Sequence, residues 1–139
     1  MKVESYTLEV VLEAERGFAD ITKEVQEFVE KSGVTQGIAT VFVTGSTGAV
    51  IAMEYEPGLR KDIPEALERI APRHGDYAHH LTWGDDNGSS HVRASLLGPS
   101  MVVPVVNGRL TLGTWQQVVV VNLDTKKRKR RVVVQVMGV

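Results

Sequence analysis

The sequence predicts a single α+β domain over residues 1–139, mostly an antiparallel sheet or sandwich of about seven strands with two to three helices. Three observations lead to this class. The chain has 139 residues, which suits one hydrophobic core. Its hydrophobic and charged fractions, 42% and 24%, are those of a globular protein. Valine, a β-branched strand former, occurs 23 times, and 14 of these residues lie from Val92 onward.

Composition also excludes several classes of protein. The chain contains no cysteine, which excludes disulfide scaffolds, thiolate zinc sites and cysteine nucleophiles. No apolar run approaches the roughly 20 residues that cross a bilayer. The opening residues carry an acid, Glu4, and lack the apolar core of a signal peptide. We therefore expect a cytoplasmic protein with no membrane partner.

Hydrophobic periodicity defines the elements of the first half of the chain. In order, we expect a strand over 3–12, a helix over 21–32, strands over 37–43 and 49–55, and a helix over 63–70. Asp20 is placed to cap the first helix, and Gly33 supplies its left-handed end. Asp62 is placed to cap the second helix, and Pro72 ends it.

The second half is expected to contain a short helix and two β-hairpins. These are a helix over 90–97, a hairpin of 101–106 with 109–112, and a hairpin of 115–123 with 131–137. Asn107-Gly108 is a strong signal for the first hairpin turn. The valine runs 118–121 and 132–134 are apolar on both faces, so they are buried on both sides, within the domain or against another subunit.

Residues 126–131 form an unbroken run of six cations. Without them the chain has 10 basic against 17 acidic residues. Such a run can bind nucleic acid, or it can be a solvated hairpin turn. Because it follows Asp124-Thr125 between two valine strands, we favour the turn and expect no nucleic-acid partner.

The polar segment 72–91 has no periodicity and contains all the histidines of the chain. It carries four histidines and three aspartates: His74, His79, His80, His91, Asp76, Asp85 and Asp86. Imidazole titrates near neutral pH and ligates metals, so this cluster suits acid–base chemistry or a metal. A solvated loop is an equal alternative. An EF-hand is excluded, because Leu96 stands where the loop needs its twelfth-position glutamate.

Three further positions admit two interpretations each. The loop around Ser46-Thr47 could hold a phosphate through its N–H groups and hydroxyls, or could be an ordinary strand connection. Glu54 interrupts an apolar strand, either facing outward or serving as a buried base. Trp115 could pack in the core or form the wall of a pocket for an aromatic ring.

The run SHVRASLLGPS over 90–100 and the run LGTWQ over 112–116 closely resemble the YjbQ family. This is a widespread group of small proteins, often labelled secondary thiamine-phosphate synthases. The resemblance covers essentially the whole chain. It implies a compact α+β fold, a homotrimer, and a polar site near the subunit boundary that contains histidines and often a metal or an anion.

The resemblance also implies roles for individual residues. The catalytic group would be His79, His91, Glu54 and Asp85, and the group binding substrate or phosphate would be Ser46, Thr47, Arg93, Ser95, Thr114 and Gln116. His79 and His91 would also ligate a divalent metal, Mg or Zn. Gly45 and Ser89 stand where many members have histidine, so such a metal site would lack one or two donors here.

The implied activity is that of a thiamine-phosphate synthase, weak or secondary. Such an enzyme joins a pyrimidine diphosphate to a thiazole phosphate and releases pyrophosphate. Small phosphorylated molecules are therefore the expected ligands. Two alternatives stay open, namely a metal-assisted hydrolase acting on phosphates and a non-enzymatic, trimeric ligand-binding protein.

Overall fold

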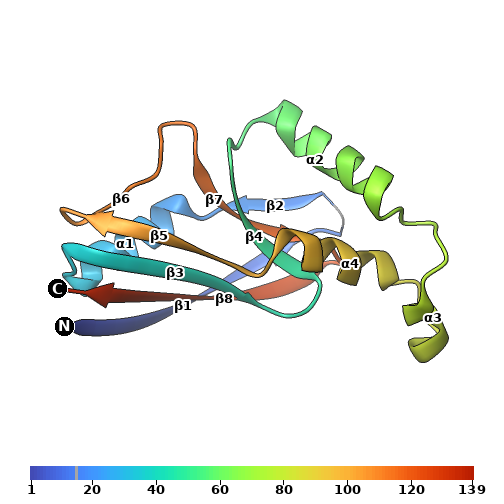
Figure 1. Ribbon diagram of the computed structural model, residues 1–139, viewed down its shortest axis with the longest axis horizontal. Coiled ribbons are helices and arrows are strands. Elements are labelled where there is room, and N and C mark those ends of the chain that lie inside the picture. Colours follow the sequence, from blue (N-terminus) through green and yellow to red (C-terminus); the bar gives the residue numbers. More distant parts are fainter. Residues whose placement is uncertain (15) are drawn as a thin grey trace.

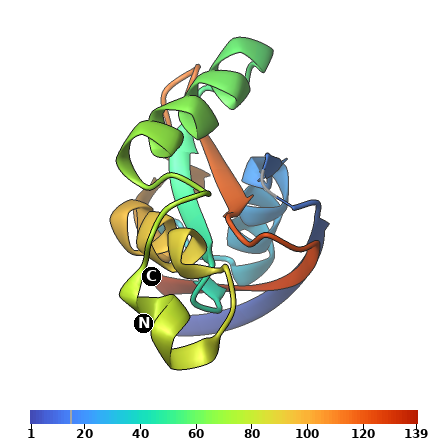
Figure 2. The ribbon, with the colours of Figure 1, turned by 90° about the vertical axis from the view of Figure 1, so that its right-hand side faces the viewer.

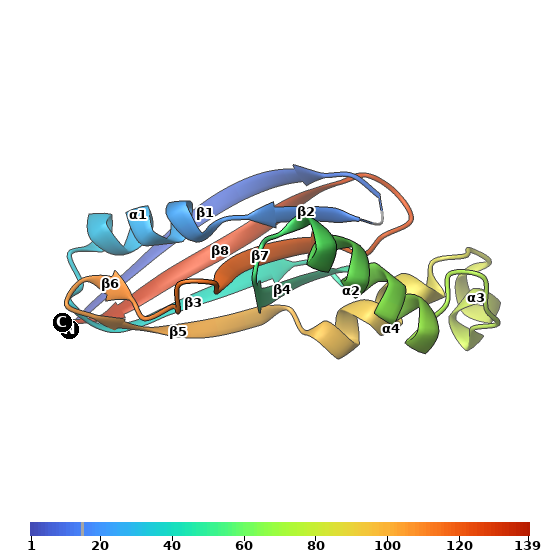
Figure 3. The same ribbon diagram turned by 90° about the horizontal axis from the view of Figure 1, so that it is seen from above.

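The computed structural model describes residues 1–14 and 16–139. Within them, eight strands form two antiparallel sheets, and four helices pack around the sheets (Figures 1 and 3). The predicted α+β class is confirmed. Among the described residues, no helix has the length and apolar character that a membrane span requires.

The larger sheet forms one outer layer of the molecule. Its strands, in spatial order, are β1 (Lys2–Leu12), β8 (Arg128–Gly138), β3 (Gln36–Thr44), β5 (Ser100–Val106) and β6 (Arg109–Leu110). Side chains alternate along these strands, so Val132, Val134 and Val136 of β8 lie in the core. The predicted turn between β5 and β6 is confirmed, with left-handed backbone at Asn107 and Gly108.

The middle layer contains the smaller sheet and one helix. The sheet has the order β2 (Gly17–Asp20), β7 (Gln117–Asn122), β4 (Gly48–Met53), and α1 (Thr22–Ser32) packs against the larger sheet. In β7, Val118 and Val120 belong to the core shared with the larger sheet and α1. Val119 and Val121 belong to a second core on the opposite face. The valine run of β7 is therefore covered on both faces within the chain.

The other three helices gather at one end of the molecule, which faces the viewer in Figure 2 and lies on the right of Figure 3. They are α2 (Pro57–Ile70), α3 (Ala78–Trp83) and α4 (Gly88–Leu97). Leu67 of α2 and Ala94 of α4 close the second core over β7. The short helix α3 lies beyond the end of α2, beside the start of α4 (Figure 1).

Helix α2 begins earlier than the sequence predicted. It starts at Pro57 and not near Asp62, which is an exposed residue inside the helix. Glu56 is its N-cap, and the carboxylate of Glu56 accepts hydrogen bonds from the N–H groups of Gly58 and Leu59. Proline fits the first position of a helix, so Pro57 begins α2 and Asp62 lies within it.

The predicted hairpin of 115–123 with 131–137 is wrong. Strands β7 and β8 lie in different sheets, so the chain passes from the middle layer to the outer layer between them. Asn122 anchors this crossing, because its Nδ2 donates to the carbonyl oxygens of Glu13 and Lys126, at 2.9 and 3.0 Å. The cationic run is therefore no hairpin turn, since β8 begins at Arg128.

Candidate functional site

Two of the histidines singled out in the sequence, one on α3 and one on α4, contact each other. The ring centroids of His79 and His91 lie 4.4 Å apart, with the planes tilted by 35°. Nδ1 of His79 lies 3.3 Å from Oδ1 of Asp85. This Nδ1 is sealed from solvent and forms no hydrogen bond with the described residues. These three side chains, His79, Asp85 and His91, are called the histidine group below.

The connection between α3 and α4 places the histidine group. Gly84 ends α3 in the left-handed conformation, and its N–H donates to the carbonyl oxygen of His80 at 2.8 Å. The chain then turns at Asp85, whose Oδ1 accepts a hydrogen bond from the N–H of Asn87 at 3.2 Å. The ring centroids of His80 and His79 lie 6.5 Å apart, and Nε2 of His80 accepts a hydrogen bond from the N–H of Gly88 at 3.2 Å. The N–H of Gly88, the first residue of α4, is therefore occupied by this hydrogen bond to His80.

Large apolar side chains on α3 and α4, the helices that carry His79 and His91, are exposed. Leu81 and Trp83 of α3 are 90% and 71% exposed, and Val92 and Leu96 of α4 are also exposed. Val92 and Leu96 are four residues apart, so they share the outer face of α4. These four residues are called the apolar rim below. An exposed apolar surface of this kind usually marks an interaction site.

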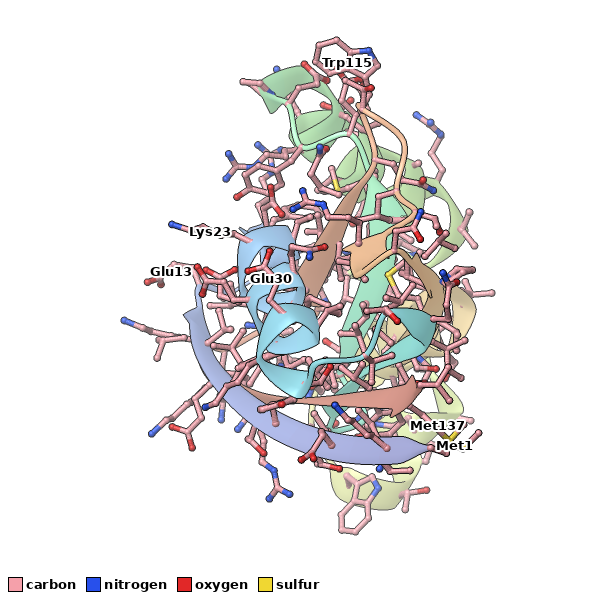
Figure 4. All side chains as sticks on the ribbon, turned by 90° about the vertical axis from the view of Figure 1, so that its left-hand side faces the viewer. Met1, Glu13, Lys23, Glu30, Trp115 and Met137 are labelled. Atoms are coloured by element: carbon pink, nitrogen blue, oxygen red, sulfur yellow. The ribbon has the colours of Figure 1, made fainter. Side chains whose placement is uncertain are left out.

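Glu54, Thr114 and Gln116 lie elsewhere, and we call them the glutamate group. Glu54 directly follows β4, where Met53 pairs with Gln117 of β7. Thr114 and Gln116 are exposed in the loop between β6 and β7, and Trp115 of this loop extends outward (Figure 4).

The two groups are separated by the length of α2. Glu54 precedes the start of this helix, and α3 follows its end (Figure 1). A helix of 14 residues spans about 20 Å. One chain therefore does not bring the histidine group and the glutamate group together.

Thr47 and Ser46 lie at a third place, in the turn between β3 and β4. Thr47 is buried, and its hydroxyl donates to Oδ2 of Asp124 at 2.9 Å while accepting from Nη2 of Arg130 at 2.6 Å. Ser46 is exposed. At Gly45, whose φ is +120°, a Cβ atom would lie 2.8 Å from Nη1 of Arg130. The space in which a side chain at position 45 would lie is therefore occupied on one side by an arginine.

Asp124 is the centre of this buried polar cluster, which the sequence analysis missed as a site. Burial raises its pKa, but hydrogen bonds from Asn87, Thr47, the N–H of Lys126 and Arg128 outweigh burial and hold the pKa below its usual value. Arg128 and Asp124 are four residues apart and form an ion pair of 3.1 Å. Only the position of Asp124 immediately before the cationic run could have indicated this pairing.

Arg93 and Ser95 occupy opposite faces of α4. Arg93 is buried, and its Nε donates to the carbonyl oxygen of Ala71 at 2.8 Å while its Nη2 pairs with Glu68 at 2.7 Å. Ser95 is exposed. Arg93 therefore joins α4 to the end of α2, and these contacts do not involve the histidine group.

The donor set for a metal is incomplete within one chain. Over residues 1–14 and 16–139, no three His, Asp or Glu side chains gather closely enough to hold a metal ion. Ser89, where the resemblance led us to expect a missing metal ligand, is buried and accepts a hydrogen bond from Nη1 of Arg73 at 3.0 Å. This residue is a structural partner of Arg73.

Comparison with known proteins gives the family. The family described as UPF0047 protein YjbQ-like matches residues 6–139 of the chain. The chain belongs to the YjbQ-like UPF0047 family. The resemblance drawn from residues 90–100 and 112–116 is thereby confirmed.

YjbQ-like relatives match the chain over nearly their full lengths. A UPF0047 protein of Methanothermobacter thermautotrophicus is 42% identical over 138 residues, covering 98% of this chain and 94% of the relative. The UPF0047 protein YugU of Bacillus subtilis is 31% identical over 133 residues, covering 95% and 98%.

Solved structures of similar proteins have the same fold. A protein of unknown function from Sulfolobus solfataricus superposes with a TM-score of 0.88 at 35% identity, covering 99% of this chain and 100% of that one. A hypothetical protein from Aeropyrum pernix superposes with a TM-score of 0.84 at 33% identity, covering 100% of both chains. The YjbQ-like fold is therefore established, whereas the names of these relatives assign no activity.

Proposed function

We propose that the YjbQ-like chain is a subunit of a homo-oligomeric enzyme, a homotrimer, that acts on a small phosphorylated molecule by acid–base catalysis. In this proposal, the histidine group of one copy and the glutamate group of the next copy form one active site. The contact of His79 with both Asp85 and His91 is the observation that carries the proposal.

The histidine group has the composition of an acid–base centre. A carboxylate that faces one imidazole nitrogen helps to orient the ring for proton transfer at the other nitrogen. Asp85 stands in this relation to Nδ1 of His79, at 3.3 Å. Nε2 of His79 then exchanges the proton with substrate, and His91 supplies a second imidazole against the first ring.

The apolar rim supports a site at a boundary between copies. Leu81 and Trp83, on the same helix as His79, are exposed, and neither His79 nor His91 lines the cavities beneath α2, beside α1 or beside Pro57. A cyclic trimer joins two different surfaces of neighbouring copies. Such an interface would cover the rim and bring the glutamate group of a second copy to the histidines.

The first reaction to test is the condensation of a pyrimidine diphosphate with a thiazole phosphate, which releases pyrophosphate. The departing diphosphate needs a cation. Mg or Zn held by His79, His91 and Glu54 of a second copy would be an alternative use of the site, with a position open for substrate, because Nε2 of His79 cannot both ligate an ion and exchange a proton. Because the described residues of one chain supply no set of three metal ligands, we assign the proton transfers to the histidine side chains and route none of them through a metal.

A complementation experiment tests the shared site. His91→Ala and Glu54→Gln are each expected to abolish condensation, measured as pyrophosphate release with both substrates and Mg²⁺. Co-expression of the two variants with different tags should give mixed oligomers in which about one quarter of the sites have both native groups. Recovery of about that fraction of activity supports the proposal, and mixed oligomers that stay inactive contradict the shared site.

His74→Ala is the matched control, because His74 is exposed outside the histidine group. It should retain full activity. A phosphomonoester substrate in a parallel assay distinguishes a metal-assisted hydrolase from the condensing enzyme. If neither reaction occurs in the native oligomer, or if His91→Ala leaves the activity unchanged, the catalytic assignment is wrong and a non-enzymatic trimer is the better description.

A further inference from the structure

We propose that a cavity beneath α2 is a second ligand site, which takes a small organic monoanion with one carboxylate and a short apolar body. The cavity has a volume of about 180 Å³ and lies between α2, β2, β7 and α4. It is separate from the histidine group, none of whose members lines it.

The apolar wall of the cavity comes from the second core. Phe18 of β2, Leu67 of α2, Val121 of β7 and Leu123 line it, and all four are buried. An apolar cavity of about 150 Å³ accommodates benzene. The volume beneath α2 therefore fits a single ring or a branched chain of similar size, and it excludes a nucleotide.

The polar wall contains a buried guanidinium group with donors to spare. Arg93 is 4% exposed and lines the cavity. Its hydrogen bonds use Nε, toward Ala71, and Nη2, toward Glu68. No described residue accepts a hydrogen bond from its Nη1. An arginine has five N–H donors in a planar fork that matches a carboxylate, so Arg93 can bind one while keeping its structural contacts.

Arg73 holds the neighbouring part of the wall in place. Its Nη1 donates to the hydroxyls of Ser89 and Ser90, at 3.0 and 2.8 Å, and its Nη2 donates to the carbonyl oxygen of Leu123 at 2.6 Å. These contacts fix the guanidinium beside the cavity. Arg73 therefore fixes the shape of this part of the wall.

The charges around the cavity favour a monoanion. Arg16 is exposed at the entrance, so the described inner lining holds two arginines, Arg73 and Arg93, and two glutamates, Glu65 and Glu68. A carboxylate adds one negative charge beside Arg93, whereas a phosphate monoester adds about −1.5 to −2 at neutral pH next to the two glutamates. The glutamates thus disfavour the more highly charged phosphate.

The entrance to the cavity is cationic. Arg16 is exposed and also lines a shallow depression next to the cavity, together with Pro57, Arg60 and Lys61. The guanidinium of Arg60 stacks over the ring of Tyr55 at 4.6 Å, which holds it near this depression. Clustered cations raise the local concentration of an anion and speed its association.

Titration of the full-length protein with benzoate tests the proposal, with calorimetry and methyl NMR as the measurements. We expect saturable binding in the millimolar range or tighter, with shifts confined to methyl groups of Leu67, Val121 and Leu123. Benzyl alcohol, the neutral analogue, should bind at least about tenfold more weakly, and phenyl phosphate should bind more weakly than benzoate. If phenyl phosphate bound more strongly than benzoate, the site would be one for phosphate monoesters and the carboxylate assignment would be overturned.

Variants separate this site from a general charge effect. Arg16→Gln should weaken benzoate binding by about threefold to tenfold, whereas Lys23→Gln, which removes an exposed charge on α1, should not. His91→Ala should leave benzoate binding unchanged, so this site and the proposed active site succeed or fail independently. Equal binding of benzoate and benzyl alcohol, no binding, or shifts located outside the cavity would each overturn the proposal.

Discussion

The backbone N–H of Gly88 donates a hydrogen bond to Nε2 of His80 at 3.2 Å, and this contact attaches α3 to the first turn of α4. A Cβ atom at position 88 would lie 2.6 Å from Cβ of Tyr77, so only glycine allows this approach. Because His79 and His91 lie on the same two helices, their contact depends on this packing.

Replacing His80 by alanine should loosen α3. The N–H of Gly88 loses its acceptor, and we expect the free energy of unfolding to fall by about 1 kcal/mol. Amide hydrogen exchange at Gly88 should accelerate more than exchange in β7. His74→Ala is the control, since His74 is exposed, and equal effects of the two substitutions would contradict the assigned role of His80.

Asp124 should make stability depend on acid pH. Its pKa is lowered in the folded state, and an unfolded aspartate has a pKa of about 3.9. The stabilisation is therefore fully present above that value and is lost as the pH falls through the folded-state pKa. Asp124→Asn should cost about 2–4 kcal/mol at pH 7, and chemical denaturation should show this difference shrinking below about pH 4.

Asp86→Asn is the matched control for Asp124, because Asp86 is exposed in the loop before α4. It should leave the pH profile of unfolding unchanged. A difference between Asp124→Asn and the native chain that stays constant from pH 7 to pH 2 would show that the carboxylate charge plays no part.

Glu56 and Asp62 give a direct test of where α2 begins. Glu56→Ala removes the acceptor for the N–H groups of Gly58 and Leu59, and loss of an N-cap costs about 1 kcal/mol. Asp62→Ala, inside the helix, should change the thermal midpoint little. The reverse order of the two effects would place the start of the helix near Asp62.

The cations of 126–131 should divide into two classes on mutation. Arg130 is buried and donates to Thr47 and to Asn122, at 2.6 and 2.7 Å. Arg130→Gln should therefore cost about 3 kcal/mol or more in unfolding free energy, since it leaves buried groups without partners.

Lys129 offers the contrasting substitution in the same run. It pairs with Glu9 on the surface at 2.8 Å, so Lys129→Gln should cost less than about 1 kcal/mol. The native chain should show no salt-dependent binding to a DNA duplex at low ionic strength, measured by fluorescence anisotropy. Such binding, weakened by the Lys129 substitution, would contradict the structural role of the run.

Local signals in the sequence were sufficient for elements that depend on local chemistry. Helix α1 follows from apolar spacing, and Gly33 ends it as expected. The turn at Asn107-Gly108 follows from the backbone that those residues favour. Helix α3 has six residues and no buried side chain, so it carried no periodic signal to detect.

Elements that depend on tertiary partners were not predictable in the same way. Valines occupy both faces of β7, so the local sequence does not indicate which strands pair with it. In the structure β7 pairs with β2 and β4, whereas β8 belongs to the larger sheet. The clustering of histidines in sequence did indicate where His79 and His91 would lie. It could not indicate the separation of Glu54 from them, because that depends on the full length of α2.

The double burial of β7 also bears on how the chain avoids aggregation. Val118 to Val121 form an uncharged stretch of strong strand formers without proline, the kind of segment that associates with other chains when it is exposed. Such exposure occurs before the outer layers have closed over β7. The cations that begin at Lys126, only five residues beyond Val121, place repulsive charge beside this segment in every unfolded chain. Two of these cations, Arg128 and Arg130, bind Asp124 and Asn122 in the native fold, so the run serves both the folded chain and the chain that is still folding.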